Sequence, residues 1–243
     1  MNEQRKAAGS RVYGIAGGGK LAFHLARYLD LLQLPCRRWS GRAARIPPRS
    51  ALAECSVIII AISDDAIENF IRENLDGSRA LLVQCSGALS TPLAHGAHPL
   101  TVFGTKPYPL SFYKKIPFIT EKGRALFTGL FPDLPNPHYA IDPAQKPFYH
   151  ALCSMSGNFS AILWEKFFAE MSASFGIPRK TALMYFRAAA LNIAGPCDLT
   201  GPLARGDKKT ISKHLRALEN DSFAGIYNAF AAQFAARHKE KMS

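Results

Sequence analysis

Three consecutive glycines stand where a predicted strand gives way to a predicted helix. The strand covers 11–16 and the helix covers 20–32. With Ala22 the segment fits the pattern G-x-G-x-x-A, in which small residues allow a tight turn and a close approach of the backbone to a pyrophosphate. The free N–H groups at a helix start also attract anions. We therefore expect a dinucleotide to bind here, with contacts from Gly17, Gly18, Gly19, Lys20 and Leu21.

The second predicted strand covers 35–39, and the segment that follows it discriminates between dinucleotides. Enzymes that use NAD carry an acid there for the ribose 2′-hydroxyl, whereas an arginine accommodates the 2′-phosphate of NADP. No acid occurs between Asp30 and Glu54. The sequence therefore predicts NADP(H) as the cofactor. The expected 2′-phosphate contacts are Ser40, Gly41 and Arg42, with Arg38 or Arg45 as helpers.

The third predicted strand, 56–62, is apolar on both faces, which is typical of a central strand in a parallel sheet. A helix with acids in its first turn follows it. In doubly wound folds the ligand cleft lies at the carboxyl ends of the strands. Ile62, Ser63 and Asp64 are therefore further predicted cofactor contacts.

Two polar residues follow the fourth predicted strand, 80–85. Ser86 comes directly after this strand, and His98 stands in a His-Pro pair 12 residues later. Hydride transfer needs a group that holds or protonates the substrate oxygen or nitrogen. We expect His98 to act as the acid or base and Ser86 to orient the substrate. The alternative is that His98 only braces a loop through the hydrogen bonds of its ring.

A polar stripe crosses the otherwise apolar helix predicted over 147–175. His150, Ser154 and Asn158 recur at intervals of four, which places them on one helix face. We expect this face to line the substrate cleft, with Asn158 orienting the substrate and His150 as a second candidate proton donor. The alternative is a stripe that faces solvent or another helix.

Two cations are candidates to contact the substrate. Arg205 could hold a substrate carboxylate bidentately, and Lys106 could line the cleft from the other side. Asp207 is explained as the N-cap of a helix, and a pairing of Arg205 with Asp207 is the alternative for the arginine.

The elements that position these residues are of two kinds. Up to residue 142, short apolar runs alternate with helices, as in βαβ units, and weaker strands are predicted at 101–103, 117–120 and 138–141. Beyond residue 142 the pattern predicts helices over 147–175, 178–194, 207–218 and 222–237. We expect a Rossmann-type, mostly parallel α/β domain over 1–142 and an all-α domain over 143–243.

The composition excludes several classes of protein. With Gly 18, Pro 16 and Cys 5 in 243 residues, the chain is not collagen-like, disordered or disulfide-stapled. No run approaches the ~20 apolar residues that span a bilayer, and the N-terminus lacks the apolar stretch of a signal peptide. The cysteines form no C-x-x-C pair, which favours reduced thiols in a cytoplasmic protein. No histidine stands at metal-ligand spacing from a carboxylate or thiol, so no metal site is expected.

The net charge of +12 is concentrated near the N-terminus. Residues 1–50 hold 10 Lys and Arg against 2 acids, and the densest part of this charge follows the second predicted strand. This distribution favours a local preference for one phosphate over a general affinity for polyanions. A nucleic-acid-binding protein is the lower alternative, because the chain carries no known nucleic-acid-reading motif.

Several motifs follow one another along the chain in a familiar order. They are Gly17–Ala22, Ala61–Ile67, Cys85–Leu89, His98–Leu100, Asn158 and Leu199–Asp207, followed by His214 and Leu215. This series resembles a bacterial family that pairs a Rossmann-like domain with a helical C-terminal domain of unknown function. The layout is similar to that of pyrroline-5-carboxylate reductases, ketopantoate reductases, prephenate dehydrogenases and deazaflavin-dependent NADP oxidoreductases. The resemblance implies a helical domain like the C-terminal domain of 6-phosphogluconate dehydrogenase.

The resemblance also implies roles for single residues. In prephenate dehydrogenases a serine after the fourth strand and a histidine of a His-Pro motif lie near the nicotinamide, and Ser86 and His98 match them. The lysine that follows shortly after that serine has no counterpart at Gly87 and Ala88. Hydroxyacid dehydrogenases and ketopantoate reductases place Lys and Asn four apart on the long helix. Asn158 matches this Asn, but Ser154 stands in the Lys position, which leaves a histidine to donate the proton.

The sequence thus predicts a cytoplasmic NADP(H)-dependent oxidoreductase that transfers a hydride to or from a small carbonyl, imine or hydroxy acid. The alternative is an NADP(H)-binding sensor or regulator with reduced catalysis, because the usual lysine is missing. Related folds dimerise through the helical domain, so a homodimer is a further hypothesis. No membrane partner is expected.

Overall fold

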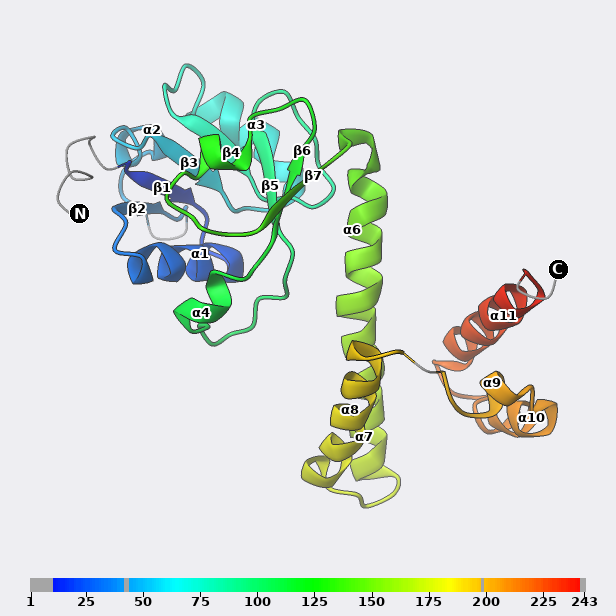
Figure 1. Cartoon of the computed structure of the whole chain (residues 1–243). Coiled ribbons are helices and arrows are strands. Elements are labelled where there is room, and N and C mark those ends of the chain that lie inside the picture. Colours follow the sequence, from blue (N-terminus) through cyan, green and yellow to red (C-terminus); the bar gives the residue numbers. More distant parts are fainter. Residues whose placement is uncertain (1–10, 42–43, 198, 241–243) are drawn as a thin grey trace, which may run out of the picture. The chain divides into compact units, whose positions relative to one another are not determined.

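The computed structural model describes residues 11–41, 44–197 and 199–240, and Figure 1 shows the chain with its elements labelled. Contacts between residues divide it into two compact units, 1–163 and 164–243. No helix in the described ranges has both the length and the apolar character required to cross a membrane.

The first unit is built on a seven-stranded sheet with the order β2-β1-β3-β4-β5-β6-β7. Every neighbouring pair is parallel except β5 and β6, which are antiparallel. The strands are β1 (Tyr13–Ala16), β2 (Cys36–Trp39), β3 (Val57–Ile60), β4 (Leu81–Gln84), β5 (His95–Pro99), β6 (Phe118–Glu121) and β7 (His138–Ile141). The predicted Rossmann-type, mostly parallel sheet is confirmed.

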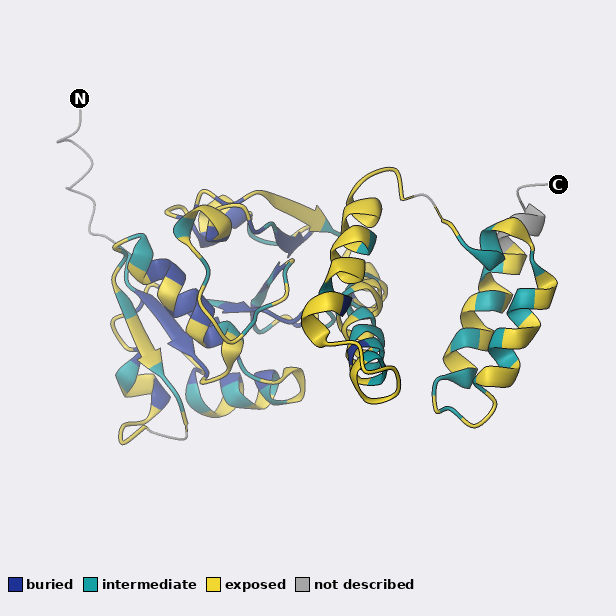
Figure 2. Ribbon diagram, turned by 90° about the horizontal axis from the view of Figure 1, so that it is seen from below, coloured by how far each residue is buried: buried dark blue, intermediate teal, exposed yellow. Residues whose placement is uncertain are grey.

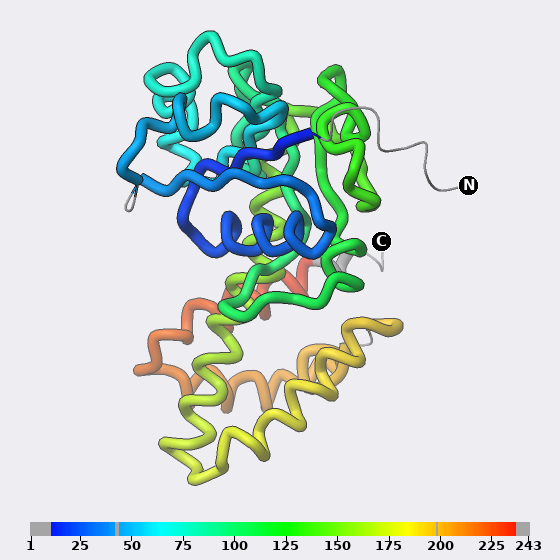
Figure 3. Tube along the Cα trace, turned by 90° about the vertical axis from the view of Figure 1, so that its left-hand side faces the viewer, coloured from blue at the N-terminus to red at the C-terminus, as the bar shows by residue number. Residues whose placement is uncertain are grey.

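Helices cover both faces of this sheet. They are α1 (Lys20–Leu31), α2 (Pro48–Ala51), α3 (Asp64–Asn74), α4 (Leu110–Tyr113) and α5 (Phe127–Leu130). Figures 1 and 3 show α1 and α3 on opposite sides of the central strands. One apolar core forms around Leu25 and Leu29 of α1, and a second forms around Ile67 and Ile71 of α3. Burial on both faces explains why β1 and β3 are apolar throughout.

The chain reverses direction across the sheet between β1 and β3. From β1 it passes to β2 at the edge, and then returns to β3 on the other side of β1. In open α/β sheets such a switch point leaves a crevice at the carboxyl ends of the two strands, where ligands bind. The glycine run after β1 and the segment after β3 therefore meet at the same crevice.

The strand that carries His98 lies earlier than the sequence predicts. The predicted strand at 101–103 is wrong, because those residues are irregular and β5 covers His95–Pro99 instead. This strand contains no β-branched residue, so its sequence lacks the usual strand signal. Pairing with β4 on one side and β6 on the other holds it in the sheet. His98 is therefore a strand residue and not part of a loop.

A single long helical segment follows the sheet, as predicted. It consists of a 3₁₀ turn (Pro143–Gln145), α6 (Lys146–Ser154), a π-helical turn η2 (Met155–Phe159) and α7 (Ser160–Ala173). The predicted boundary after residue 142 coincides with the end of β7, but the compact units divide after Leu163. The reason is that α6 is bonded to the sheet through its own side chains, as described below, and stays with the first unit.

The second unit is helical throughout its described elements. It contains most of α7 and then α8 (Arg179–Ala194), α9 (Pro202–Arg205), α10 (Lys208–Ala217) and α11 (Ala224–Glu240). Trp164 of α7 packs edge-on against Phe186 of α8, with ring centroids 4.9 Å apart. His214 of α10 hydrogen-bonds to the Tyr227 hydroxyl of α11 at 2.9 Å. Figure 2 shows that buried residues are concentrated in the first unit, whereas the helices of the second unit are mostly exposed or intermediate.

Candidate functional site

The glycine run lines a hollow of about 510 Å³ at the switch point of the sheet. The walls come from the carboxyl ends of β1, β2 and β3. The lining residues are Gly17, Gly18, Gly19, Trp39, Ser40, Gly41, Ala61, Ile62, Ser63 and Ala66. Seven of the predicted cofactor contacts are thus brought together in one crevice: Gly17, Gly18, Gly19, Ser40, Gly41, Ile62 and Ser63.

The three glycines meet different surroundings. Gly17 has a φ of +149°, and a Cβ added there would lie 2.1 Å from the Ala61 carbonyl oxygen. A Cβ on Gly18 would lie 2.5 Å from the Ser40 hydroxyl, whereas a Cβ on Gly19 would meet no atom within 4 Å. Gly17 is therefore required by the fold itself, whereas at Gly18 the Ser40 side chain would have to move. The open space at Gly19 leaves room for a ligand.

The start of α1 leaves its first N–H groups without a side-chain partner. Gly19 is the N-cap of this helix and offers no side-chain cap to the first N–H groups. Those groups carry the positive end of the helix dipole and suit a phosphate. Lys20 and Leu21 form the first turn of α1 but do not line the hollow.

The residues expected at a 2′-phosphate are placed only in part. Ser40 and Gly41 line the hollow, and Arg42 lies outside the described residues. Arg38 and Arg45 are exposed. Trp39, which the sequence analysis did not single out, contributes its ring to the wall, and its indole N–H donates to the Ile46 carbonyl at 3.0 Å. The sequence signal that could have identified Trp39 is the position of an aromatic residue at the end of β2.

Asp64 and Ser86 are joined to each other. The Ser86 hydroxyl donates to the Asp64 carboxylate at 2.5 Å and accepts from the backbone N–H of Leu89 at 2.8 Å and of Ala88 at 3.1 Å. One donor and two acceptor sites are all that a serine hydroxyl has. Ser86 therefore connects α3 to the turn after β4 and has no hydrogen left for a substrate. Asp64 does not line the glycine hollow.

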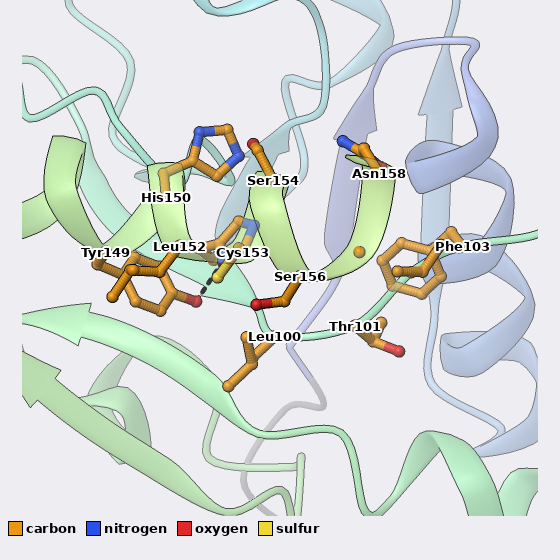
Figure 4. A pocket seen from close by; sticks show the side chains of 13 residues that line it. Leu100, Thr101, Phe103, Tyr149, His150, Leu152, Cys153, Ser154, Ser156 and Asn158 are labelled. Carbon is orange, nitrogen blue, oxygen red and sulfur yellow. Dashed lines mark hydrogen bonds between the residues drawn. The ribbon is translucent and has the colours of Figure 1, made fainter. Parts of the chain in front are cut away.

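His98 opens on a second hollow of the first unit, of about 700 Å³. Its wall is formed by the end of β5, the segment that follows, and one side of α6 and η2, as Figure 4 shows. The lining residues are His98, Leu100, Thr101, Val102, Phe103, Tyr149, His150, Leu152, Cys153, Ser154, Ser156, Gly157 and Asn158. The hollow thus contains four of the five residues that the sequence assigned to catalysis.

The predicted polar stripe is present on the long helix. In Figure 4 the side chains of His150, Ser154 and Asn158 project from the same side of the helix. The π-helical turn at Met155–Phe159 lies in the middle of the wall, and it adds Gly157 to the lining. Such turns occur frequently at functional sites, because they shift the side chains that follow out of the regular helical phase.

The imidazole of His98 is held by the helix opposite. Its Nδ1 forms a hydrogen bond of 2.8 Å with the Tyr149 hydroxyl, and its ring lies edge-on to the ring of His150 with centroids 5.6 Å apart. Burial, reinforced by His150 and Lys146 and partly opposed by Asp64, lowers the pKa of His98 to about 4. The ring is therefore neutral at physiological pH.

Gly87 has a structural role that the sequence did not reveal. A Cβ at this position would lie 2.4 Å from Cδ2 of His150. The imidazole of His150 therefore lies directly against the backbone of the turn after β4. The absence of a side chain at this position is what admits the histidine ring.

A buried ion pair fixes the beginning of α6, and no local sequence pattern predicts it. Lys146 is 2% exposed, and its Nζ donates to Glu121 Oε1 on β6 at 2.7 Å and to the Leu89 carbonyl in the turn after β4. A Cβ on Gly96 of β5 would lie 2.6 Å from the same Glu121 oxygen. Lys146 therefore connects α6, β6 and the turn after β4, and Gly96 leaves the space for the pair.

Lys106 does not line the His98 hollow. Lys106 is exposed in the segment before α4. Arg205 belongs to the second unit, where it lines a separate hollow of about 520 Å³ together with Lys208 and the apolar Leu203. Asp207 caps α10 by accepting from the Thr210 N–H at 3.0 Å, as predicted. Within the described residues, no group of three or more His, Cys, Asp or Glu side chains is arranged to hold a metal ion.

Comparison with known proteins identifies the domain at the C-terminal side of this site. Residues 118–234 match the family model described as a domain of unknown function, DUF2520. The matched segment covers just under half of the chain. Within it lie α6 and η2, which form one wall of the His98 hollow, and the helices of the second unit as far as residue 234 in α11. A search of curated proteins found no match.

Solved structures with the same fold cover the matched segment and the sheet domain together. A candidate NADP oxidoreductase from Bacteroides fragilis is 20% identical, with a TM-score of 0.75 over 93% of this chain and 98% of that one. An imine reductase from Myxococcus stipitatus in complex with NADP+ is 14% identical, with a TM-score of 0.63 over 94% of each chain. A reductive aminase from Aspergillus terreus in complex with NADPH and ethyl levulinate is 15% identical, with a TM-score of 0.58 over 95% of this chain and 94% of that one. These likenesses show a shared fold.

The low pKa of His98 predicts a pH-dependent stability. In the unfolded chain the imidazole binds a proton near pH 6.5, whereas the folded protein binds it only near pH 4. Between these values the unfolded state holds more protons, so the free energy of unfolding falls as the pH is lowered through this window. We expect His98→Gln to lose less stability than the wild type between pH 7 and pH 4.5 in urea unfolding. Parallel profiles for the two proteins would contradict the prediction.

Proposed function

We propose that this protein is an NADP(H)-dependent oxidoreductase that acts on a small carbonyl, imine or hydroxy acid. The observation that carries the proposal is the pairing of two hollows in the first unit: a glycine-lined crevice suited to a dinucleotide, and a hollow lined by a neutral histidine. Asp64 is adjacent to the crevice in the sequence and acts electrostatically on the hollow of His98. It directly follows Ser63 of the crevice, and its charge acts on His98.

The crevice fits the dinucleotide by its own chemistry. Unbonded N–H groups at the start of α1 suit the pyrophosphate, and the space beside Gly19 admits it. Trp39 and Ser40 stand where the adenosine end would lie in a fold of this kind. When bound, the cofactor supplies or accepts the hydride.

The His98 hollow fits a small, partly apolar substrate. Leu100, Val102, Phe103 and Leu152 provide apolar walls, and Asn158 and Ser154 provide hydrogen-bonding groups. Nε2 of His98 makes no hydrogen bond within the described residues, so it is left to contact the substrate oxygen or nitrogen. We assign His98 as the acid or base, Asn158 as an orienting group and His150 as its neighbour in the wall.

The proposal is tested by binding and by turnover. Purified protein is titrated with NADPH by fluorescence, and NADPH oxidation is then followed with a panel of small ketones, 2-keto acids and cyclic imines. We expect binding, and turnover with at least one class that falls by about 100-fold or more in His98→Gln. Absence of NADPH binding would overturn the proposal. Tight binding without turnover on any compound would replace it by the sensor hypothesis.

The preference for the 2′-phosphate is tested at Arg42. Arg42→Ala is expected to weaken NADPH binding by about tenfold to 100-fold and to leave NADH binding nearly unchanged, because a charged hydrogen bond to a phosphate is lost. Arg37→Ala is the matched control, since Arg37 is engaged with Glu54 at 3.2 Å on the exposed edge strand. Equal losses for both dinucleotides would refute the assignment of Arg42.

We further propose that the protein forms a homodimer through its helical unit. Only Phe168 and Ala182 are buried among the described residues of this unit, whereas Met184, Leu191 and Ile193 of α8 are 62%, 75% and 66% exposed. Apolar surfaces of this kind usually mark an interface. Light scattering should give about twice the chain mass of 26.6 kDa. Leu191→Glu should shift the mass to that of one chain, unlike the exposed control Lys180→Glu; a monomeric wild type would exclude the dimer.

A further inference from the structure

The hydroxyl of Tyr149 lies between two groups of the His98 hollow. It is 2.8 Å from Nδ1 of His98, and the Cys153 side chain adjoins it from the next turn of α6. Figure 4 shows the tyrosine hydroxyl and the cysteine sulfur next to each other in the wall. Burial, with Cys153 as a second cause, raises the pKa of Tyr149. The phenol therefore keeps its single hydrogen and must direct it to one of these two neighbours.

The chemistry of the two acceptors decides the direction. A neutral imidazole has one nitrogen that donates and one that accepts, whereas a cysteine sulfur is only a weak acceptor. The tyrosine hydrogen is therefore best placed on Nδ1 of His98, and the oxygen can then accept the weak S–H donor of Cys153. With Nδ1 occupied as an acceptor, the hydrogen of the neutral ring lies on Nε2.

We propose that Tyr149 is a positioning residue that fixes His98 in the tautomer with its hydrogen on Nε2. This inference rests on the proposed function, because it makes His98 a proton donor for the reductive direction. Nε2 is the ring nitrogen without a hydrogen bond in the described structure. The tyrosine thus directs the only ring hydrogen to the nitrogen that remains for a substrate. Its action passes entirely through the histidine.

The proton balance is complete with this arrangement. As the substrate carbon gains the hydride that the cofactor supplies, its oxygen or nitrogen takes the proton from Nε2 of His98. Nδ1 of the same ring then takes the hydroxyl proton of Tyr149, so that the imidazole stays neutral. When the product leaves, Nε2 takes a proton from water and Nδ1 returns its proton to the phenolate, which restores the starting tautomer. The reverse sequence serves oxidation.

The groups around His98 agree with a donor that stays neutral. His150 and Lys146 disfavour a positive charge on the ring, and Asp64 favours it to a lesser degree. Lys146 is itself bonded to Glu121 and lies at the start of α6, and Tyr149 and His150 follow in the same helix. A neutral histidine cannot donate from a nitrogen that carries no hydrogen, so the tautomer decides whether it acts as an acid.

The test is a direct observation of the tautomer. Long-range ¹H–¹⁵N spectra of uniformly labelled protein distinguish a protonated from an accepting ring nitrogen, and the His98 signals are assigned by their loss in His98→Gln. We expect Nε2 protonated and Nδ1 accepting in the wild type at neutral pH. A wild-type ring with its hydrogen on Nδ1 would overturn the proposal, whether or not the protein oxidises NADPH.

Variants supply the second arm. Tyr149→Phe should give His98 a mixture of tautomers and lower kcat for reduction by about 100-fold, with NADPH affinity unchanged. Cys153→Ala should retain the tautomer, because the Tyr149–His98 bond remains. The matched control is Tyr139→Phe, since Tyr139 of β7 is 63% exposed. An unaltered His98 tautomer in folded Tyr149→Phe would also refute the role of the tyrosine.

Discussion

Replacement of Gly19 by alanine is expected to weaken NADPH binding by about 100-fold while the thermal stability stays within about 1 °C of the wild type. A Cβ at Gly19 meets no protein atom within 4 Å, and the backbone there is extended, with a φ of −82° that any residue adopts. The added methyl group therefore costs the fold nothing. It occupies the space through which a pyrophosphate would approach the N–H groups of α1.

Two neighbouring glycines provide the contrast. Gly17→Ala places its methyl group against the Ala61 carbonyl and requires a left-handed φ, so it is expected to destabilise the fold itself. Gly18→Ala meets the Ser40 hydroxyl and should have an intermediate effect. Calorimetry and NADPH titration of the three variants separate folding from binding. Unchanged NADPH affinity in Gly19→Ala would show that the dinucleotide does not bind against this turn.

Replacement of Lys146 by methionine is expected to lower the free energy of unfolding by about 3–5 kcal/mol. The variant leaves the Glu121 carboxylate 3% exposed with its principal cation removed, and it leaves the Leu89 carbonyl with one donor fewer. An uncompensated buried charge is among the few causes of so large an effect. Urea unfolding at neutral pH measures the change.

A double variant distinguishes the effect of the buried charge from the effect of lost side-chain packing. Glu121→Gln combined with Lys146→Met removes the isolated carboxylate and should recover a large part of the lost stability. The reason is that the desolvation cost of a buried ion pair offsets much of the attraction between its two charges. The exposed pair of Arg27 with Asp30 is the control, and Arg27→Met should change stability far less. If Lys146→Met alone were as stable as the wild type, the pair of Lys146 with Glu121 would not be buried in solution.

The same lysine bears on the site. It holds the beginning of α6 against the turn that carries Ser86 and Gly87, and the next turn of α6 carries Tyr149 and His150. Even the folded fraction of Lys146→Met should therefore show a disturbed His98 hollow. The pair thus connects stability with the position of the candidate acid.

Much of the fold was predictable because its strands and helices depend on local sequence patterns. Apolar runs bounded by turn residues located six of the seven strands, and the period of apolar residues located α1 and the long helices after β7, but not the short helices α2, α4 and α5. The glycine run after β1 and the polar stripe on α6 were found for the same reason, since each depends on neighbours within a few residues. β5 was missed because His95–Pro99 has no strand-like composition and is held by its partners in the sheet.

The sequence by itself determined the type and order of the elements, the position of the glycine turn and the residues that line one helix face. Only the tertiary structure decided which of these residues bond to each other. It joined Ser86 to Asp64, Tyr149 to His98 and Lys146 to Glu121. These partners lie too far apart in the sequence for a local periodicity to reveal them. The reason is physical: local propensity depends on backbone geometry within a turn or a strand, whereas the partner of a buried polar group depends on which elements the sheet brings together.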